Sequence, residues 1–310
     1  MQVPQNHRLR RRLLTISKAM GGILLLLVVC TFISPARNLV FWPFWPNAWR
    51  KMTTFDIIQI EISDLPDNVT ALAHCPYAKR KPLSQAKLNK ALIKDYAQVV
   101  KRSTTGELQN QEHLAFMPAL PFQEKLGLVW LFAVLARALS DAGVTFFMRG
   151  GSLLGAARHR GIIPWDDDID IAINVSDWKR VREVLSCLDG HYVQVEPNMH
   201  WKFSRVDNLF PFIDLFFYAE SERYIWALTD YTRRTFTLRK EDVLPLQPTV
   251  FEGVEVLVPR RAVKISKELY SYNTCESRSL DHKSGVSFSR VVTVPCSSLA
   301  YLYDMYDLDD

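Results

Sequence analysis

The chain has 310 residues, of which 48% are hydrophobic and 23% charged, and its formal net charge is +5. This composition excludes a disordered chain and indicates a folded body of one large or two small domains. The positive charge is concentrated at the N-terminus, in Arg8, Arg10, Arg11, Arg12 and Lys18. Because the remainder is close to neutral, the net charge does not support nucleic-acid binding.

An uncharged stretch at 19–36, centred on "GGILLLLVVCTFI", follows this basic cluster. Its 18 residues are close to the minimum for crossing a bilayer. The excess of basic residues before it predicts a cytosolic tail at 1–18 and a lumenal body after the span. A cleaved signal peptide has the same charge order, but the long basic region and the lack of an A-x-A site favour a signal anchor. Both alternatives place the body in the secretory pathway.

Four of the five cysteines would then be lumenal, where disulfides form: Cys75, Cys187, Cys275 and Cys296. Four cysteines allow three pairings, and the sequence leaves all three open. No C-x-x-C spacing occurs, so a zinc ribbon has no support. Asn68 begins an N-V-T sequence and is expected to be a glycosylation site.

Residues 37–117 are expected to form a lumenal stem, with room for one helix at about 84–101. A compact domain is expected at 118–310, because periodic apolar patterns begin there. The order of its elements predicts an α/β or α+β domain with a small mixed sheet. The expected elements are a helix at 122–143, a strand at 144–148, a helix at 152–161, a strand at 168–175, a helix at 176–188, strands at 201–207 and 212–219, and a hairpin at 250–259.

The segment "PWDDDIDIAI" combines four aspartates with alternating isoleucines. In a strand, Asp166, Asp168 and Asp170 would share one face, and the isoleucines would enter the core from the other. Carboxylates this close raise one another's pKa unless a cation lies among them. Mg²⁺ or Mn²⁺ would remove that cost, because such ions take oxygen ligands and substrate phosphates. Asp214 in "PFIDLFFY" is the expected additional ligand, since an unpaired carboxylate in an apolar strand is costly.

Two other interpretations of the aspartates are weaker. A solvated acidic turn needs no alternating isoleucines after it. An EF-hand calcium loop fits the spacing of the first three ligands, but Ile171 stands where glycine is required and Asp177 where glutamate is expected.

The sequence Gly150-Gly151-Ser152 precedes the aspartates and predicts a turn that binds phosphate, since its backbone N–H groups and the following helix N-terminus suit an anion. Basic residues could neutralise the remaining phosphate charge, and the first candidate is Arg158, which belongs to the same motif. The other candidates are Arg160, Lys202 and Arg205. His159 is expected to have a structural role.

The segment "GGSLLGAARHRGIIPWDDDIDIAI" closely resembles the signature of the LicD family, which includes fukutin and fukutin-related protein. "FIDLFFY", "EDVLPL" and "FEGVEVLVP" resemble later segments of the same domain, in the same order. The resemblance covers roughly residues 120–270. It implies a nucleotidyltransferase-like fold and the transfer of a phosphorylated alcohol, such as ribitol phosphate or phosphocholine, from a CDP-activated donor to a glycan.

By position, the resemblance implies that Asp168, Asp170 and Asp214 bind the metal and that residues 150–152 bind the donor. All three aspartates, together with Asp166, are expected to be catalytic. Either Asp166 or Asp214 could accept the proton of the acceptor hydroxyl, and the sequence does not choose between them.

The topology looks like that of the Golgi members of the family, which implies a single-pass type II membrane protein with a lumenal catalytic domain. Its expected partners are a CDP-alcohol and the glycan of a glycoprotein or glycolipid, and homo-oligomerisation stays open. The chain departs from the family in three ways. The C-terminal "MYDLDD" lacks a glycine-tryptophan ending, no zinc-binding cysteine cluster is evident, and the stem is short.

Two other functions remain as alternatives. Metal-dependent glycosyltransferases that use nucleotide-sugars also carry D-x-D carboxylates, so only the Gly-Gly-Ser turn favours the phosphotransferase. A non-catalytic lumenal subunit of glycan assembly is the second alternative, and the retention of every motif acid argues against it.

Overall fold

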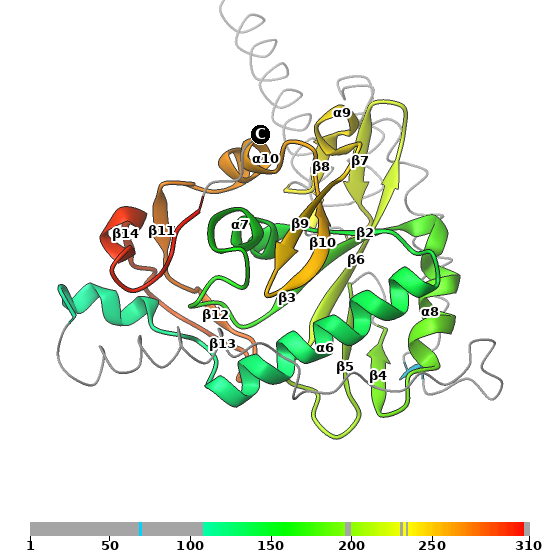
Figure 1. Ribbon diagram of the computed structural model, residues 1–310, viewed down its shortest axis with the longest axis horizontal. Helices are drawn as coiled ribbons and strands as arrows, with labels where there is room; N and C mark the ends of the chain where they lie inside the picture. The colour runs from blue at the N-terminus through cyan, green and yellow to red at the C-terminus, as the bar shows by residue number, and fades with distance from the viewer. Residues whose placement is uncertain (1–67, 70–107, 196–199, 230–231, 234, 307–310) are drawn as a thin grey trace, which may run out of the picture. The chain divides into compact units, whose positions relative to one another are not determined.

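Figure 1 shows a computed structural model of the protein, which describes residues 68–69, 108–195, 200–229, 232–233 and 235–306. The predicted cytosolic tail, the signal anchor and the helix at about 84–101 lie outside the described residues. Among the residues that are described, no helix is long and apolar enough to cross a membrane.

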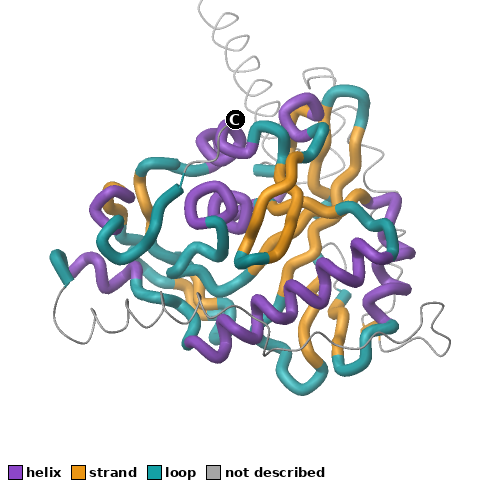
Figure 2. The backbone as a smooth tube through the Cα atoms, viewed as in Figure 1, coloured by secondary structure: helices purple, strands orange, loops and turns teal. Residues whose placement is uncertain are grey.

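A mixed sheet forms the centre of the described part, with helices on its outside (Figure 2). Strands β3 and β6 run parallel, and the other neighbouring strands run antiparallel. The main path of the sheet is β1 (Asn68–Val69), β4 (His191–Gln194), β5 (Trp201–Arg205), β6 (Ile213–Glu220), β3 (Ile169–Asn174) and β2 (Phe146–Met148). From β6 the sheet also extends to β7 (Tyr224–Ala227) and β8 (Thr237–Arg239). The predicted mixed α/β architecture is therefore confirmed.

The helices are η4 (Gln111–Phe116), α6 (Phe122–Asp141), α7 (Gly150–His159), η5 (Val175–Asp177), α8 (Trp178–Ser186), α9 (Lys240–Val243), α10 (Ala262–Leu269) and η7 (Cys296–Leu299). Three two-stranded antiparallel sheets complete the described part: β9 (Gln247–Phe251) with β10 (Val254–Val258), β11 (Thr274–Glu276) with β14 (Thr293–Pro295), and β12 (Leu280–Asp281) with β13 (Val286–Ser287).

The isoleucine face of β3 is buried under helix α6. Phe132 of α6 contacts Phe146 of β2 and Phe251 of β9 edge-to-face, with ring centroids 6.2 and 5.6 Å apart. Ile169, Ile171 and Ile173 are completely buried. The alternation of β3 thus fixes its register, as the sequence predicted, and leaves the aspartate side of the strand for polar groups.

The predicted strands and the hairpin are present with slightly shifted ends, but two details near the motif differ. Strand β3 begins at Ile169, so Asp166 and Asp168 lie in the loop before it. The backbone bends there, because the N–H of Asp166 donates to the carbonyl of Ile163. The glycine pair does not precede the helix as a separate turn, since α7 begins at Gly150 itself.

The C-terminal segment packs against α7 and forms an apolar cluster with it. This cluster also takes in Phe116 of η4, so the folded part begins before the predicted boundary at Pro118. A disulfide joins Cys275 to Cys296 inside the cluster, and Cys187 is also disulfide-bonded. The members of this apolar cluster are Phe116, Leu154, Ala157, Ile163, Trp165, Val263, Tyr272, Cys275, Val294, Cys296, Leu299 and Leu302.

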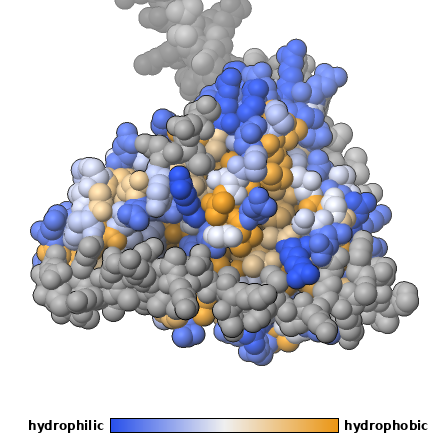
Figure 3. Space-filling model, in the orientation of Figure 1, coloured by the Kyte–Doolittle hydropathy of each residue, from blue (hydrophilic) through white to orange (hydrophobic). Residues whose placement is uncertain are grey.

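The expected stem also reaches the sheet at one point, because Asn68 of β1 lies opposite Gln194 of β4. Glycosylation of Asn68 stays a prediction. On the face shown in Figure 3, apolar residues reach the surface in the middle and hydrophilic residues surround them. Val250 of β9, whose exposed fraction is 46%, is one of the exposed apolar residues of the described part.

Candidate metal and phosphate site

Three neighbouring strands bring the predicted site residues together. Asp170 of β3 lies opposite Asp214 of β6, and Asp214 lies opposite Lys202 of β5. Asp168, in the loop before β3, reaches the same place. Carboxylate oxygens of Asp168, Asp170 and Asp214 all lie within 4.8 Å of one another. The structure therefore assembles the three predicted metal ligands from two segments of the chain.

The pKa values of Asp166, Asp168 and Asp170 are raised, mainly because of burial and then because of repulsion between the carboxylates. Burial and the charges of Asp170 and Asp167 raise the pKa of Asp166 to about 7. Burial is also the main cause for Asp170, whose pKa rises to about 6, although the charge of Arg149 opposes the shift. Burial and then the charges of the neighbouring aspartates raise the pKa of Asp168 well above its usual value. A divalent cation among these oxygens would relieve the repulsion, so the donor set fits Mg²⁺ or Mn²⁺.

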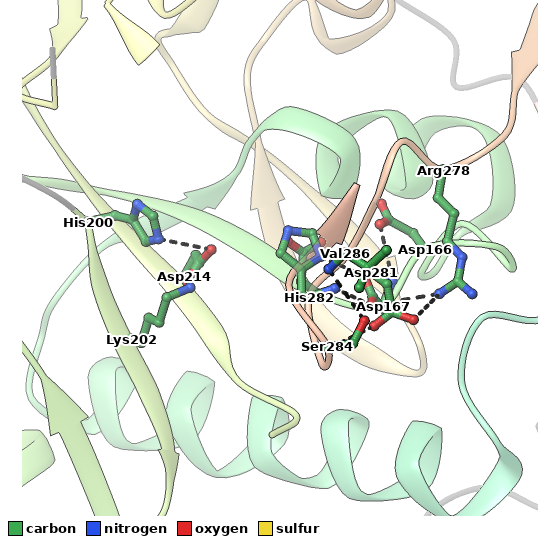
Figure 4. Close-up of polar contacts among 11 residues, drawn as sticks. Asp166, Asp167, His200, Lys202, Asp214, Arg278, Asp281, His282, Ser284 and Val286 are labelled. Atoms are coloured by element: carbon green, nitrogen blue, oxygen red, sulfur yellow. Dashed lines mark hydrogen bonds and ion pairs between the residues drawn. The ribbon is translucent and has the colours of Figure 1, made fainter. Parts of the chain in front are cut away.

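Asp214 differs from these acids because two basic side chains hold it (Figure 4). Lys202 donates to its Oδ1 from 2.9 Å, and Nε2 of His200 lies 3.2 Å from Oδ2. Burial alone would raise the pKa of Asp214, but His200 and Lys202 outweigh burial and lower it. Asp214 therefore stays ionised, and Lys202 lies within the site as its partner.

The two glycines bring the N-terminus of α7 against the carboxylates. Gly150 has a φ of +57°, and a Cβ there would lie 2.5 Å from Oδ2 of Asp170. A Cβ on Gly151 would lie 2.9 Å from Oδ2 of Asp166. The positive end of the helix dipole thus faces the acids, where it can also stabilise a phosphate.

Ser152 supports this arrangement from inside the fold. Its exposed fraction is 4%, and its Oγ accepts a hydrogen bond of 2.8 Å from the backbone N–H of Asp170. The side chain therefore ties α7 to β3. Its hydroxyl is engaged within the fold, so the substrate-binding role expected of Ser152 stays a prediction.

Arg158, the first predicted phosphate ligand, does not lie in the carboxylate group. Its side chain is buried, and Nη1 donates to the carbonyl of Tyr272 and contacts Sγ of Cys296. Burial lowers its pKa to about 10. The side chain of Arg158 extends from α7 toward Tyr272 and Cys296 of the apolar cluster, so Arg158 supports the fold. Its neighbour His159 has a pKa lowered to about 3 by burial and by Arg158, which fits the structural role predicted for it.

The other two basic candidates also lie apart from the carboxylates. Arg205 forms an ion pair with the exposed Asp207 beyond the end of β5. Arg160 caps the C-terminus of α7, and its guanidinium lies 4.3 Å from the ring centre of Tyr306. Of the four predicted basic residues, the structure brings only Lys202 to the site.

Two residues near the site were not predicted to take part. The side chain of Asp167 is 2% exposed, and His282 of the turn between β12 and β13 contacts it at 2.6 Å. His282 also lies 3.3 Å from Asp168. These residues are 115 positions apart, so no local pattern signals the contact.

Arg149, at the N-cap of α7, was also missed. Its exposed fraction is 7%, and its guanidinium carbon lies 3.7 Å from the ring centre of Phe216. The position directly before the glycine pair was the available signal, because a residue there flanks the helix N-terminus.

The described part is thus a mixed α/β domain with a candidate metal site. Residues 143–261 match the family model of the LicD/FKTN/FKRP nucleotidyltransferase domain. This match confirms the resemblance of the motif to that family.

Three relatives illustrate the match. Ribitol 5-phosphate transferase FKRP of Mus musculus is 59% identical over 39 residues, which are 13% of this chain and 8% of the relative. Ribitol-5-phosphate transferase FKTN of Mus musculus is 30% identical over 101 residues, 31% of this chain and 22% of the relative. Lipopolysaccharide cholinephosphotransferase LicD of Haemophilus influenzae is 44% identical over 41 residues, 13% of this chain and 16% of the relative. The matches thus span less than a quarter of each of these relatives.

Proposed function

We propose that the protein is a metal-dependent phosphotransferase that moves a phosphorylated alcohol, similar to ribitol phosphate, from a CDP-activated donor to a glycan. One observation carries the proposal: Asp168, Asp170 and Asp214 converge within 4.8 Å beside a helix N-terminus. Carboxylates for a cation and N–H groups for an anion are the two requirements of phosphoryl transfer. The names of the family relatives agree with this class of reaction.

Asp168, Asp170 and Asp214 would hold Mg²⁺ or Mn²⁺. The ion would supply charge neutralisation on the pyrophosphate of the donor and on the leaving CMP. The backbone N–H groups at the start of α7 would bind phosphate oxygens. The glycines let this helix end lie close to the acids, because a Cβ at 150 or 151 would lie 2.5 or 2.9 Å from a carboxylate oxygen. Ser152 keeps α7 and β3 in position for both functions.

In the reaction, the oxygen of an acceptor hydroxyl attacks the phosphorus that carries the alcohol. The bond from this phosphorus to the bridging oxygen of the pyrophosphate breaks, and CMP leaves with that oxygen. Asp166 is the better acceptor for the hydroxyl proton, because its pKa is raised to about 7, whereas both oxygens of Asp214 are held by Lys202 and His200 and its pKa is lowered.

The proposed place of action is the Golgi lumen, reached through the predicted signal anchor at 19–36. The disulfide between Cys275 and Cys296 supports an oxidising compartment. The acceptor would be a glycan of a glycoprotein or glycolipid. The nature of the transferred alcohol is the question that the experiment has to answer.

The test measures the thermal stability of the purified full-length chain with Mn²⁺ or Mg²⁺ and a panel of nucleotides. The panel contains CDP-ribitol, CDP-glycerol, CDP-choline, UDP-sugars and GDP-sugars. A ligand at a hundred times its dissociation constant stabilises a protein by about 2.7 kcal/mol, which is easily seen. We expect one CDP-alcohol to stabilise the wild type only when metal is present, and Asp168→Asn/Asp170→Asn to abolish the shift.

Other results would contradict the proposal. Stabilisation by UDP- or GDP-sugars alone would show a glycosyltransferase. A folded protein that responds to none of the nucleotides would favour a non-catalytic subunit of glycan assembly.

A further inference from the structure

The turn between β12 and β13 places a nitrogen donor beside the carboxylate group. His282 lies in this turn, beyond the end of the family match at residue 261, and Figure 4 shows its ring directed toward the aspartates. Asp168 belongs to two sets of possible metal ligands. One set is Asp168, Asp170 and Asp214, and the other is Asp167, Asp168 and His282.

The ring of His282 is held in one orientation by a single buried carboxylate. Nδ1 lies 2.6 Å from Oδ1 of Asp167, and the backbone N–H of His282 donates to Oδ2 of the same residue from 3.0 Å. Because an ionised carboxylate only accepts hydrogen bonds, Nδ1 carries the proton that it shares with Asp167. In the neutral ring, the lone pair is then on Nε2.

This lone pair is directed at the proposed metal site. Nε2 of His282 lies 3.3 Å from Oδ2 of Asp168. Two ligand atoms in adjacent positions around one ion, each about 2.1 Å from it, are about 3 Å apart. A carboxylate that holds the far nitrogen of a metal-bound imidazole is a recurrent arrangement in metalloproteins.

We propose that His282 is a nitrogen ligand of the metal ion held by Asp168, and that Asp167 is the positioning residue that orients its ring. The inference rests on the proposed function, since it extends the same metal site. Both oxygens of Asp167 contact His282, and Arg278 lies 3.9 Å from Oδ2, which fits a residue that orients the ring of His282.

A nitrogen ligand changes the choice of metal. Mg²⁺ strongly prefers oxygen ligands, whereas Mn²⁺ and later first-row ions bind imidazole more readily. Three carboxylates without His282 would suit either ion. With His282, the site favours Mn²⁺ over Mg²⁺.

The alternative is that His282 only fastens the C-terminal segment to the motif through ion pairs with Asp167 and Asp168. In that case the ring would stay protonated when metal binds and would contact the carboxylates without touching the ion. The two hypotheses differ in whether Nε2 of His282 is bonded to the bound ion.

The experiment uses electron spin-echo envelope modulation of Mn²⁺ bound to the full-length chain, purified without a histidine tag. We expect a ¹⁴N coupling from imidazole in the wild type and its loss in His282→Gln. In parallel, Mn²⁺ and Mg²⁺ dissociation constants are measured by titration. His282→Gln should weaken Mn²⁺ binding at least about tenfold and Mg²⁺ binding less, and Asp167→Asn should weaken Mn²⁺ binding by a similar factor.

Lys283→Gln is the matched control, because Lys283 is the next residue in the same turn and pairs with Glu124 instead. It should leave both the coupling and the Mn²⁺ affinity unchanged. Bound Mn²⁺ without ¹⁴N coupling in the wild type, or a coupling that persists in His282→Gln, would overturn the role of His282 and leave the proposed function standing. A wild type that binds no Mn²⁺ would overturn both. If His282→Gln does not fold, the absence of a ¹⁴N coupling in the wild type, or an unchanged Mn²⁺ affinity in Asp167→Asn, would still overturn the role of His282.

Discussion

The central sheet and the C-terminal segment 272–306 both contribute to the carboxylate group, but they do so by different forces. The sheet positions charge through backbone pairing: Asp170, Asp214 and Lys202 face one another across three strands. The C-terminal segment positions the loop before β3 through packing. Trp165, next to the aspartates, contacts Phe116 edge-to-face and donates from its indole nitrogen to the carbonyl of Glu276.

The acids therefore depend on two separate supports, the pairing of the strands and the packing of the apolar cluster. Hydrogen bonds between strands fix Asp170 and Asp214 to within a narrow range, because register shifts would expose the buried isoleucines. Asp166, Asp167 and Asp168 have no strand around them and rely on the apolar cluster and on His282. Changes in the sheet should therefore act on chemistry, and changes in the apolar cluster should act first on stability.

The largest effect is expected from Asp168→Asn/Asp170→Asn. The rate of CMP release from the donor should fall at least about a thousandfold, because the charges that hold the metal are removed. The melting temperature without metal should stay equal or rise, since the repulsion among the carboxylates is relieved. Both quantities can be measured on one preparation. A variant that melts much lower would show that the acids support the fold rather than the chemistry.

Gly150→Ala should have the next largest effect on activity. Its Cβ would lie 2.5 Å from Asp170, and its φ of +57° is unfavourable for alanine by about 1–2 kcal/mol. A displacement of Asp170 by about 1 Å would lower the rate about a hundredfold. Gly151→Ala is the matched control, because its φ is not positive and its contact, 2.9 Å from Asp166, is looser. Equal losses in the two variants would contradict this account.

Removal of the disulfide in Cys275→Ser/Cys296→Ser tests the support that the apolar cluster gives to the loop before β3. The two cysteines are 21 positions apart, and a loop of this size predicts a loss of about 3 kcal/mol in the free energy of unfolding. Urea denaturation measures this loss. Activity per folded molecule should change much less than in the aspartate variant. An unchanged stability with lost activity would contradict the role of the apolar cluster as a support of the fold.

The smallest effect is expected from Arg205→Ala, compared with Lys202→Ala. Lys202 holds Asp214 at 2.9 Å, so its loss should lower the rate by about tenfold or more, as expected for a partly buried charged hydrogen bond. Arg205 pairs with an exposed carboxylate and should leave the rate unchanged. A comparable loss of rate in both variants would support the phosphate-binding role that the sequence predicted for Arg205.

The sequence predicted those parts of the site that depend on local periodicity. Alternating isoleucines identified β3, and a lone acid in an apolar run identified Asp214, because strand geometry and burial leave few alternatives for such patterns. The mixed sheet followed from the order of helices and strands.

Other parts depend on contacts between distant segments and could not be predicted in this way. The orientation of Arg158 depends on Tyr272 and Cys296, and the role of Asp167 depends on His282. The start of β3 depends on a turn at Ile163 that interrupts the alternation. In each case a tertiary contact decided where a side chain points, and one local motif carries no information about it.

The most direct test of the central claim is the release of CMP from CDP-ribitol, CDP-glycerol and CDP-choline by the full-length chain, with Mn²⁺ and with the metal chelated. We expect one of these donors to yield CMP only when metal is present, and Asp168→Asn/Asp170→Asn to yield none above background. CMP release that continues after chelation, or that is equal in the double variant, would contradict the claim that these aspartates hold a metal for phosphoryl transfer.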